Sequence, residues 1–355
     1  MTTDEPGVDV WQRFPTRQVA VGFGVALVLL VGLLVAVDWR AVGVELSGAD
    51  PVVAVLAPAV ILVAFACYSE AQRRLLWSAG VELPRRGMWL RYMAAAGTRM
   101  VVPMGQAAGP AILAYAVRSA ADDGTEQAFA ATTVGGLASH AAQLSLASVG
   151  LVLVAQRGGG RLAWLVGIAV AVLATTLVSL ALLVQFRRGA LRRLAGLVAL
   201  AGQATVGRVS GRAHAALSPG AVTSRIDRFA GAIDAIADRP RTVATAFALH
   251  ATGWTLAAGA LSAALLALGR PDLVALAPLL VPTAGLIAML PLPGGLGGVE
   301  VALTALLVEV GDIAAAVAAA AVLLYRLAAY WFVVAVGATA LGVLAIGWAA
   351  ERDGD

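Results

Sequence analysis

Long apolar runs separated by short polar or arginine-rich stretches make up most of this chain. A run of about 20 apolar residues is long enough to cross the hydrocarbon core of a bilayer as a helix. The pattern therefore predicts about six full transmembrane helices, at residues 19–37, 51–68, 126–155, 162–186, 242–268 and 313–348. The last run is long enough for one tilted or bent helix, with two short helices as the alternative.

Two more apolar runs, at residues 93–117 and 273–310, are interrupted by proline and glycine. Such clusters do not continue a helix, and broken backbone is tolerated at membrane depth only where protein buries it or it lines a wet cavity. The arginine-rich stretches at residues 70–91 and 187–241 both predict cytoplasmic loops. Three apolar runs lie between these two loops, and an odd number of crossings would end on the opposite side of the membrane. One run must therefore turn back, and we expect residues 93–117 to be re-entrant.

The two interruptions share one spacing, Pro-x-Gly-x-x-Ala from residue 103 and Pro-x-Gly-x-x-Gly from residue 293. We expect the second run to be re-entrant from the opposite face, so that the pair forms an inverted repeat of the kind that supports alternating access. The predicted fold class is an all-α polytopic membrane protein with full transmembrane helices and two re-entrant broken hairpins.

The chain divides into a cytoplasmic N-terminal tail at residues 1–18, one transmembrane domain at residues 19–348 and a C-terminal tail at residues 349–355. The transmembrane domain includes the arginine-rich loop at residues 187–241. The first apolar run is long for a signal peptide and no small-residue cleavage site follows it, so we expect it to be retained. These features predict a multi-pass protein of the plasma membrane with a cytoplasmic N-terminus.

Two loops receive more detailed predictions. Residues 38–50 are expected to form a short acidic loop. Within the arginine-rich loop, apolar residues such as Phe229 and Ile233 share one helical face, which predicts a short amphipathic helix on the membrane surface, with a solvated connector as the alternative. Ser224 and Asp227 resemble a capping box at the start of that helix.

Composition supports the membrane assignment, because 60% of the residues are hydrophobic and only 13% are charged. A soluble protein carries about 25% charged residues. The net charge of +4 comes from loops, where arginine sets topology and contacts anionic lipid, so we expect membrane lipids and not nucleic acid as partners. The single cysteine, Cys67, rules out an internal disulfide.

The stretch at residues 290–300, LPLPGGLGGVE, is the strongest candidate site. Its last residue, Glu300, begins the next apolar helix, where the positive end of the helix dipole favours a carboxylate. An ionisable group at membrane depth is a functional candidate by default. The alternative is a Gly/Pro turn whose Glu300 caps a helix at the surface. We expect Gly295 and Gly298 to admit no side chain, because the backbone must turn tightly there.

Arg326 lies inside the last apolar run with Tyr330 four residues later, so the two share a helical face and a cation–π contact is available. A guanidinium is well suited to bind phosphate or a carboxylate. Arg326 is therefore expected to bind a lipid phosphate or to pair with Glu300. The alternative is that it snorkels to a headgroup or holds two helices together.

Polar residues in two other apolar runs are weaker candidates. Glu126, Thr133 and His140 recur at seven-residue spacing, and the stripe either lines a headgroup path or packs against another helix, of which we favour packing. His250 and Trp254 lie one turn apart, and a hydrogen-bonded core histidine is the favoured interpretation.

The motifs also resemble those of a known family. Residues 291–300, then Leu-Tyr-Arg at 324–326 and Tyr-Trp at 330–331, together with Pro-Met-Gly-Gln at 103–106, are similar to the transmembrane flippase-like domain of lysylphosphatidylglycerol synthetases and their stand-alone relatives. The similarity runs in order from residue 87 to residue 347, and the soluble aminoacyl-transferase domain is missing. The resemblance implies a protein that moves a lipid across the bilayer.

That lipid would be an anionic phospholipid or a polyprenyl-linked lipid. The candidate binding residues are Pro293, Gly294, Gly295, Gly297, Glu300, Arg326, Tyr330, Pro103, Gly105, Gln106 and Arg99. Arg99 precedes the first interruption and is expected to supply a second phosphate contact.

The sequence carries no Gly-x-Ser-x-Gly nucleophile elbow and no P-loop. The three histidines lie on separate segments without metal-ligand spacing. We therefore expect neither an enzyme nor a bound cofactor or metal, and transport without nucleotide hydrolysis. The alternatives are an ion-coupled transporter of a small solute with Glu300 as proton carrier, and a membrane enzyme that acts on a lipid-linked substrate.

The topology is testable by labelling. In a Cys67→Ala background, a cysteine in place of Asp123 should not react with an impermeant maleimide added to intact cells, because residues 118–126 are predicted to be cytoplasmic. Labelling of that cysteine from outside would mean that residues 93–117 cross the membrane fully, and the inverted repeat would be wrong.

Overall fold

The computed structural model describes residues 16–118, 124–156, 167 and 219–353. The predicted span at residues 162–186, most of the N-terminal tail and residues 187–218 of the arginine-rich loop lie outside the described residues. The elements are α2 (Thr16–Ala36), α3 (Trp39–Ser47), α4 (Pro51–Ser78), α5 (Arg85–Val101), α6 (Gly109–Val117), α7 (Thr125–Ala155), α11 (Pro219–Ala237), α12 (Pro240–Ala267), η2 (Pro271–Leu276), α13 (Ala277–Ile287), η3 (Pro293–Gly295), α14 (Gly298–Gly311), α15 (Ala315–Arg326), η4 (Leu327–Phe332) and α16 (Val333–Asp353).

The helices have the length and apolarity of membrane spans, and the predicted all-α polytopic class is confirmed. Among the described residues, 5 helices could cross a membrane, or up to 6 if α2 and α3, bent by 83° at their junction, form one span. The five are Pro51–Ser78, Thr125–Ala155, Pro240–Ala267, Pro293–Gly311 and Ala315–Gly347. Pro293–Gly311 differs from the others because it contains a backbone kink at Gly294.

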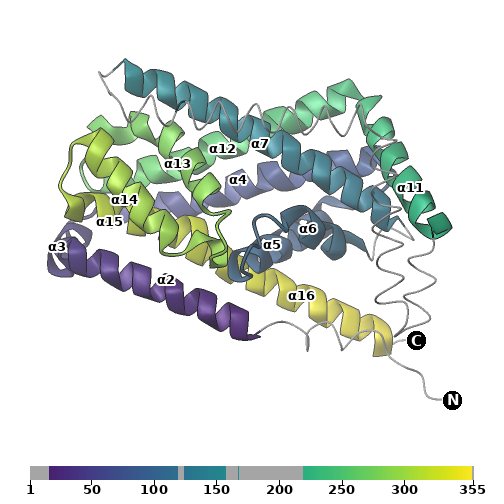
Figure 1. Ribbon diagram of the computed structural model, residues 1–355, viewed down its shortest axis with the longest axis horizontal. Helices are drawn as coiled ribbons and strands as arrows, with labels where there is room; N and C mark the ends of the chain where they lie inside the picture. The colour runs from purple at the N-terminus through teal and green to yellow at the C-terminus, as the bar shows by residue number, and fades with distance from the viewer. Residues whose placement is uncertain (1–15, 119–123, 157–166, 168–218, 354–355) are drawn as a thin grey trace.

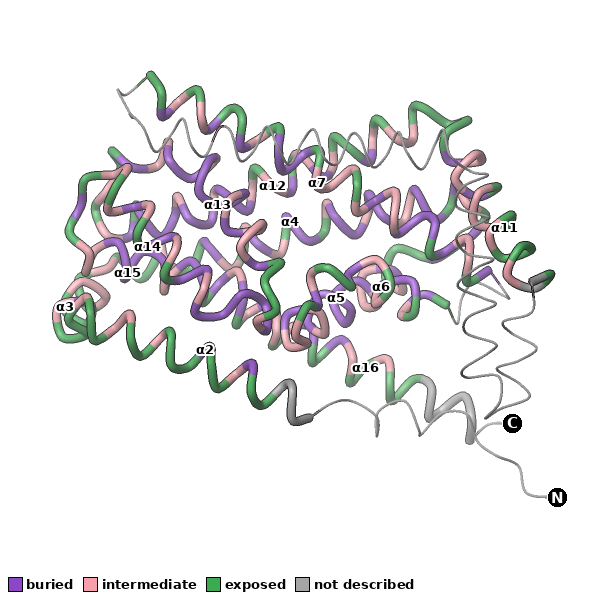
Figure 2. The backbone as a smooth tube through the Cα atoms, in the orientation of Figure 1, coloured by how far each residue is buried: buried purple, intermediate pink, exposed green. Residues whose placement is uncertain are grey.

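Helices α4 and α12 pack along each other through the middle of the molecule. Helix α7 covers α12 and α13 on one side, and α5 packs against α16, where Gly97 and Gly337 face each other closely. Helix α2 runs along α14 at the edge (Figure 1) and is exposed over most of its length (Figure 2). Exposed apolar residues such as Val28 on α2 suit contact with lipid.

Both interrupted runs form hairpins of short helices. Helix α6 packs back against α5, and α14 packs against α13. With a rise of about 1.5 Å per residue, the 9 residues of α6 and the 11 of α13 fall well short of a bilayer. The predicted broken hairpins are therefore present, while the membrane face from which each enters, and the inverted repeat, stay predictions.

The two breaks meet at one place. Pro103 of the first break and Pro293 of the second both lie beside Gly22 of α2, within 3.6 Å of a Cβ built there. Gly294 lies against the backbone carbonyl of Met100, near the end of α5. The second break, residues 293–297, is buried, partly against α2, whereas the first break is partly exposed at Met104 and Ala107.

Two of the loop predictions are wrong. Residues 38–50 are not a plain loop, because they contain α3; Asp38 caps it by accepting a hydrogen bond from the Arg40 amide at 3.1 Å, and its Val42 packs against α15. The amphipathic helix within residues 219–237 is present, and it is already helical at Pro219, five residues before Ser224. Ser224 and Asp227 therefore lie inside α11 and do not form a capping box.

The last apolar run is one continuous helix with a local change of pitch. Helix α15 passes into α16 through η4, a π-helical segment from Leu327 to Phe332. Such segments widen a helix by one residue and are frequent at functional sites. Here the segment begins immediately after Arg326, the cation that the sequence singled out. Helix α4 is also longer than predicted and ends at Ser78.

Candidate functional site

The second break is built from glycines with backbone conformations that other residues rarely adopt. Gly294, Gly295 and Gly297 have φ of 52°, 69° and 78°. A Cβ at Gly294 would overlap the ring of Tyr330, and one at Gly297 would overlap α2. Gly298 is different, because a Cβ there meets its nearest neighbour at 3.4 Å, an ordinary contact. The prediction that Gly298 admits no side chain is therefore wrong, and the one for Gly295 is confirmed.

The first break is equally tight at Gly105. A Cβ on this residue would run into the backbone carbonyl of Arg99. The preceding residue, Met104, has φ of 58°, the left-handed conformation that turns the chain between α5 and α6. Gly105 and Pro103 thus shape the break and hold the end of α5 in place, but they do not line the cavity described below.

Glu300 and Arg326 form a buried ion pair. Arg326 Nε donates to Glu300 Oε1 at 2.7 Å, and the two residues are 7% and 2% exposed. Arg326 Nη2 also donates to the carbonyl of Gly294 at 3.1 Å. Glu300 lies in the first turn of α14, where the helix dipole favours its charge. The predicted pairing of the two residues is confirmed, and it fixes the break to helix α15.

Tyr330 connects this pair to the first break. The Arg326 guanidinium carbon lies 4.7 Å from the centroid of the Tyr330 ring, so the predicted cation–π contact is present. The Tyr330 hydroxyl donates to the carbonyl of Met100 at 3.2 Å. This carbonyl belongs to the last turn of α5, where carbonyls lack helical partners. One chain of contacts therefore runs from Glu300 through Arg326 and Tyr330 to the end of α5.

Next to the ion pair lies a central cavity of about 220 Å³, lined by residues of both hairpins and of the helices that surround them. Four of the predicted site residues line it: Arg99, Gln106, Gly294 and Arg326. The other seven, Pro103, Gly105, Pro293, Gly295, Gly297, Glu300 and Tyr330, shape the breaks or hold Arg326 instead.

Arg99 is a half-buried cation that lines this cavity. It lies in the last turn of α5, where the dipole favours a cation, and its guanidinium carbon is 5.9 Å from the centroid of the Tyr92 ring. Its Nε is buried without a hydrogen-bond partner, and among the described residues no carboxylate pairs with it. Arg326, by contrast, is largely engaged by Glu300 and Gly294. Arg99 is therefore the better placed of the two for an anionic ligand.

The opposite wall of the cavity was not among the predicted binding residues, although His140, His250 and Trp254 had been weaker candidates. That wall carries uncharged polar and aromatic side chains from α4, α7 and α12: Tyr68, Gln72, Ser139, His140, Gln143, His250 and Trp254. The favoured interpretation of His250 was wrong, because neither ring nitrogen has a hydrogen-bond partner in the described part of the chain, although the residue is only 3% exposed. For the polar stripe on α7 we favoured packing against another helix. Glu126 does pair with Arg228 of α11, whereas His140 lines the cavity, as the alternative had it.

The sequence does contain a feature that points to this wall, namely the polar residues that interrupt otherwise apolar helices. Gln72, Gln143 and His250 each lie within a span and are all buried. Polar groups at membrane depth face protein or a wet cavity. What the sequence does not give is that these three residues face one another, because each helix is apolar around most of its circumference.

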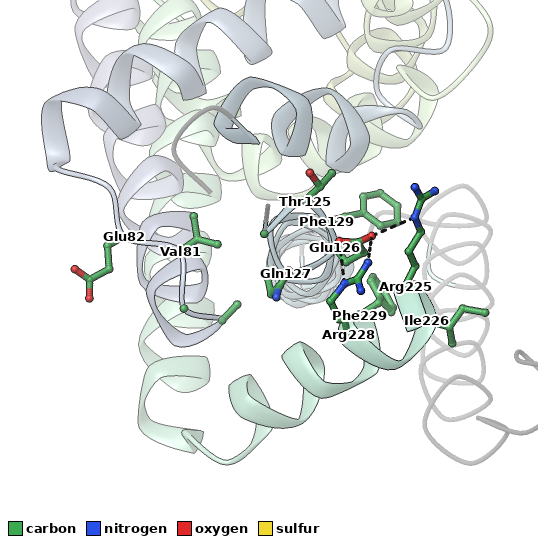
Figure 3. A pocket seen from close by; sticks show the side chains of 13 residues that line it. Val81, Glu82, Thr125, Glu126, Gln127, Phe129, Arg225, Ile226, Arg228 and Phe229 are labelled. Atoms are coloured by element: carbon green, nitrogen blue, oxygen red, sulfur yellow. Dashed lines mark hydrogen bonds and ion pairs between the residues drawn. The ribbon is translucent and has the colours of Figure 1, made fainter. Parts of the chain in front are cut away.

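A second, larger cleft of about 1330 Å³ lies between the ends of α4 and α7 and helix α11 (Figure 3). Its central carboxylate, Glu126, is already paired with Arg228 at 3.0 Å and with Arg225 at 3.5 Å. Phe129 and Phe229 pack together beside this pair, with ring centroids 5.7 Å apart. These contacts fasten α11 to α7, so we assign the cleft a structural role and the site to the central cavity.

The comparison with family models decides the identity. The model described as "Lysylphosphatidylglycerol synthase TM region" matches residues 19–337. The chain belongs to this family. No curated protein and no solved structure matches it.

The matched region of this lysylphosphatidylglycerol synthase TM-region protein includes both breaks, the ion pair and all the cavity-lining residues. Family membership and the polytopic helical fold together identify a membrane protein in lipid handling. Among the described residues, no group of three or more His, Cys, Asp or Glu could hold a metal ion.

Proposed function

We propose that this protein is a lipid translocase of the plasma membrane, in which a polar headgroup enters the central cavity while the acyl chains stay in lipid. The observation that carries the proposal is the cavity itself, which lies where two broken hairpins meet and is lined by Arg99, a cation without a carboxylate partner among the described residues. Sites of this kind, formed by discontinuous helices, are typical of transporters that alternate access. The headgroup is anionic, and its movement needs no nucleotide hydrolysis.

The ion pair has a different role in this proposal from that of Arg99. Arg326 holds Glu300 and the Gly294 carbonyl together, so it fixes the shape of the second break. Glu300 is poorly suited to be a proton carrier, because neutralising it would leave the Arg326 cation buried without a counter-ion. This supports a lipid translocase over an ion-coupled transporter of a small solute. From the arginine bias of the loops, we also propose that the N-terminus faces the cytoplasm.

Replacing Arg99 should impair transport. Hydrogen bonds to charged groups contribute about 1.5–3 kcal/mol, so we expect Arg99→Gln to slow translocation by about tenfold or more. The measurement is the transbilayer movement of fluorescent phosphatidylglycerol in proteoliposomes, followed by dithionite quenching. Arg270→Gln is the matched control, because Arg270 pairs with Asp272 in a connection far from the cavity. An Arg99→Gln rate equal to that of the wild type would contradict the proposal.

A further inference from the structure

The charges that line the central cavity are unbalanced. Arg99 and Arg326 both line it, whereas no aspartate or glutamate among the described residues does. Glu300 does not line the cavity and is already paired with Arg326. Of the residues outside the described part, 157–166 and 168–218 contain no acidic residue, whereas residues 1–15, 119–123 and 354–355 do. As far as the described residues line it, the cavity thus offers a counter-ion to a phosphate but none to an ammonium group.

The wall opposite these arginines is uncharged and able to form hydrogen bonds. Both ring nitrogens of His250 are buried without a partner among the described residues. Native proteins satisfy buried polar groups, with a ligand or water where no protein group does so. A histidine ring offers one donor and one acceptor, which suits a hydroxyl group of a ligand. His250 therefore has one donor and one acceptor available to a ligand in the cavity.

Neighbouring side chains fix this wall in place. The ring of Tyr68 stacks on His250 with centroids 5.6 Å apart. Trp254 Nε1 donates to Ser139 Oγ at 3.1 Å, and Gln143 Nε2 donates to the Pro282 carbonyl at 2.7 Å. Because their orientations are held by protein contacts, these residues present fixed polar groups and ring faces to whatever occupies the cavity.

We infer that the cavity selects a phospholipid whose phosphate carries a neutral, hydroxyl-bearing substituent, and that it rejects one with a cationic substituent. Arg99 binds the phosphate, and His250 and Gln143 hydrogen-bond the hydroxyl groups beside the ring of Trp254. This inference rests on the proposed lipid translocase function and names its substrate class. It separates this chain from the aminoacylated lipid in the family name, because a lysyl ammonium would meet two arginines and no carboxylate among the described lining residues, with only ring faces and neutral polar groups to attract it.

The test is binding of single lipids to the purified full chain in detergent, measured by native mass spectrometry. The probes are phosphatidylglycerol, phosphatidylmethanol and lysylphosphatidylglycerol with identical acyl chains. Phosphatidylmethanol has the same charge as phosphatidylglycerol but no free hydroxyl. We expect phosphatidylglycerol to bind about tenfold more tightly than either of the others. Phosphatidylmethanol loses one or two hydrogen bonds to its missing hydroxyl groups, and lysylphosphatidylglycerol places an ammonium group near two arginines.

Variants of the uncharged wall give a second measurement. His250→Leu and Gln143→Leu should lower phosphatidylglycerol binding to the phosphatidylmethanol level and leave phosphatidylmethanol binding unchanged. Thr252→Val is the matched control, since Thr252 is exposed on the same helix as His250 and bonds only to the Ala248 carbonyl. The comparison of lipids on the wild type does not depend on whether the variants fold.

The outcomes separate the two proposals. Equal binding of phosphatidylglycerol and phosphatidylmethanol to the wild type, or tighter binding of lysylphosphatidylglycerol, would overturn the inference on substrate class and leave the translocase proposal intact. No binding of any of the three lipids would overturn both.

Discussion

Removing one charge of the Glu300–Arg326 pair is expected to cause the largest loss of stability of any substitution at this site. Breaking a buried ion pair by deleting one partner costs about 3–5 kcal/mol, because the other charge is left uncompensated. That is a large share of the about 5–15 kcal/mol by which folded proteins are stable. Both Arg326→Met and Glu300→Gln should therefore lower the melting temperature of the purified protein strongly.

The double variant distinguishes pairing from independent effects. Glu300→Gln combined with Arg326→Met removes both charges, so its loss of stability should be smaller than the sum of the two single losses. Arg326→Lys should also be impaired, because an ammonium cannot bond to Glu300 and to the Gly294 carbonyl in the same fork geometry. Strictly additive losses would show that the two residues do not act as a pair.

An exposed pair with similar geometry provides the control. Arg270 also bonds to its carboxylate through Nε and Nη2, to Asp272 at 3.1 and 2.9 Å, but that pair is at the surface. Exposed ion pairs contribute about 0–1 kcal/mol. Arg270→Gln should therefore change the melting temperature little, and the difference between the two arginines measures the effect of burial.

Adding a methyl group at the second break is expected to have the next largest effect. Gly294→Ala and Gly297→Ala each force a non-glycine residue into a positive φ, which costs about 1–3 kcal/mol. Each new Cβ also overlaps a neighbour, Tyr330 at Gly294 and α2 at Gly297, and overpacking costs a further 1–3 kcal/mol or so. We expect both variants to lose thermal stability and lipid translocation together.

Gly298→Ala is the matched control on the same segment. Its Cβ has room, and the residue begins helix α14, where alanine is favoured over glycine. The variant should remain within about 1 kcal/mol of the wild type in unfolding free energy. If Gly294→Ala were as stable as Gly298→Ala, the break would be an ordinary loop and would not need its glycines.

Much of the fold was predictable because its signals are local. Apolar runs give the spans, and the clusters at Pro103 and Pro293 interrupt them wherever they occur. The ion pair was also within reach, since Glu300 and Arg326 are ionisable groups in apolar segments and such groups need partners. The missed helix α3 shows where local signals fail. It is stabilised by the Asp38 cap and by packing on α15, and the packing cannot be read from the sequence of residues 38–50.

The sequence by itself determined that this is a helical membrane protein with two broken segments and a charged pair beside one of them. Only the tertiary structure decided which charge remains unneutralised, and that Gln143, His250 and Trp254 face Arg99 across one cavity. The physical reason is that a helix in lipid is apolar on nearly every face, so its pattern does not show which side turns inward. That orientation is set by contacts between helices far apart in the chain, such as the Tyr330 hydroxyl on the Met100 carbonyl.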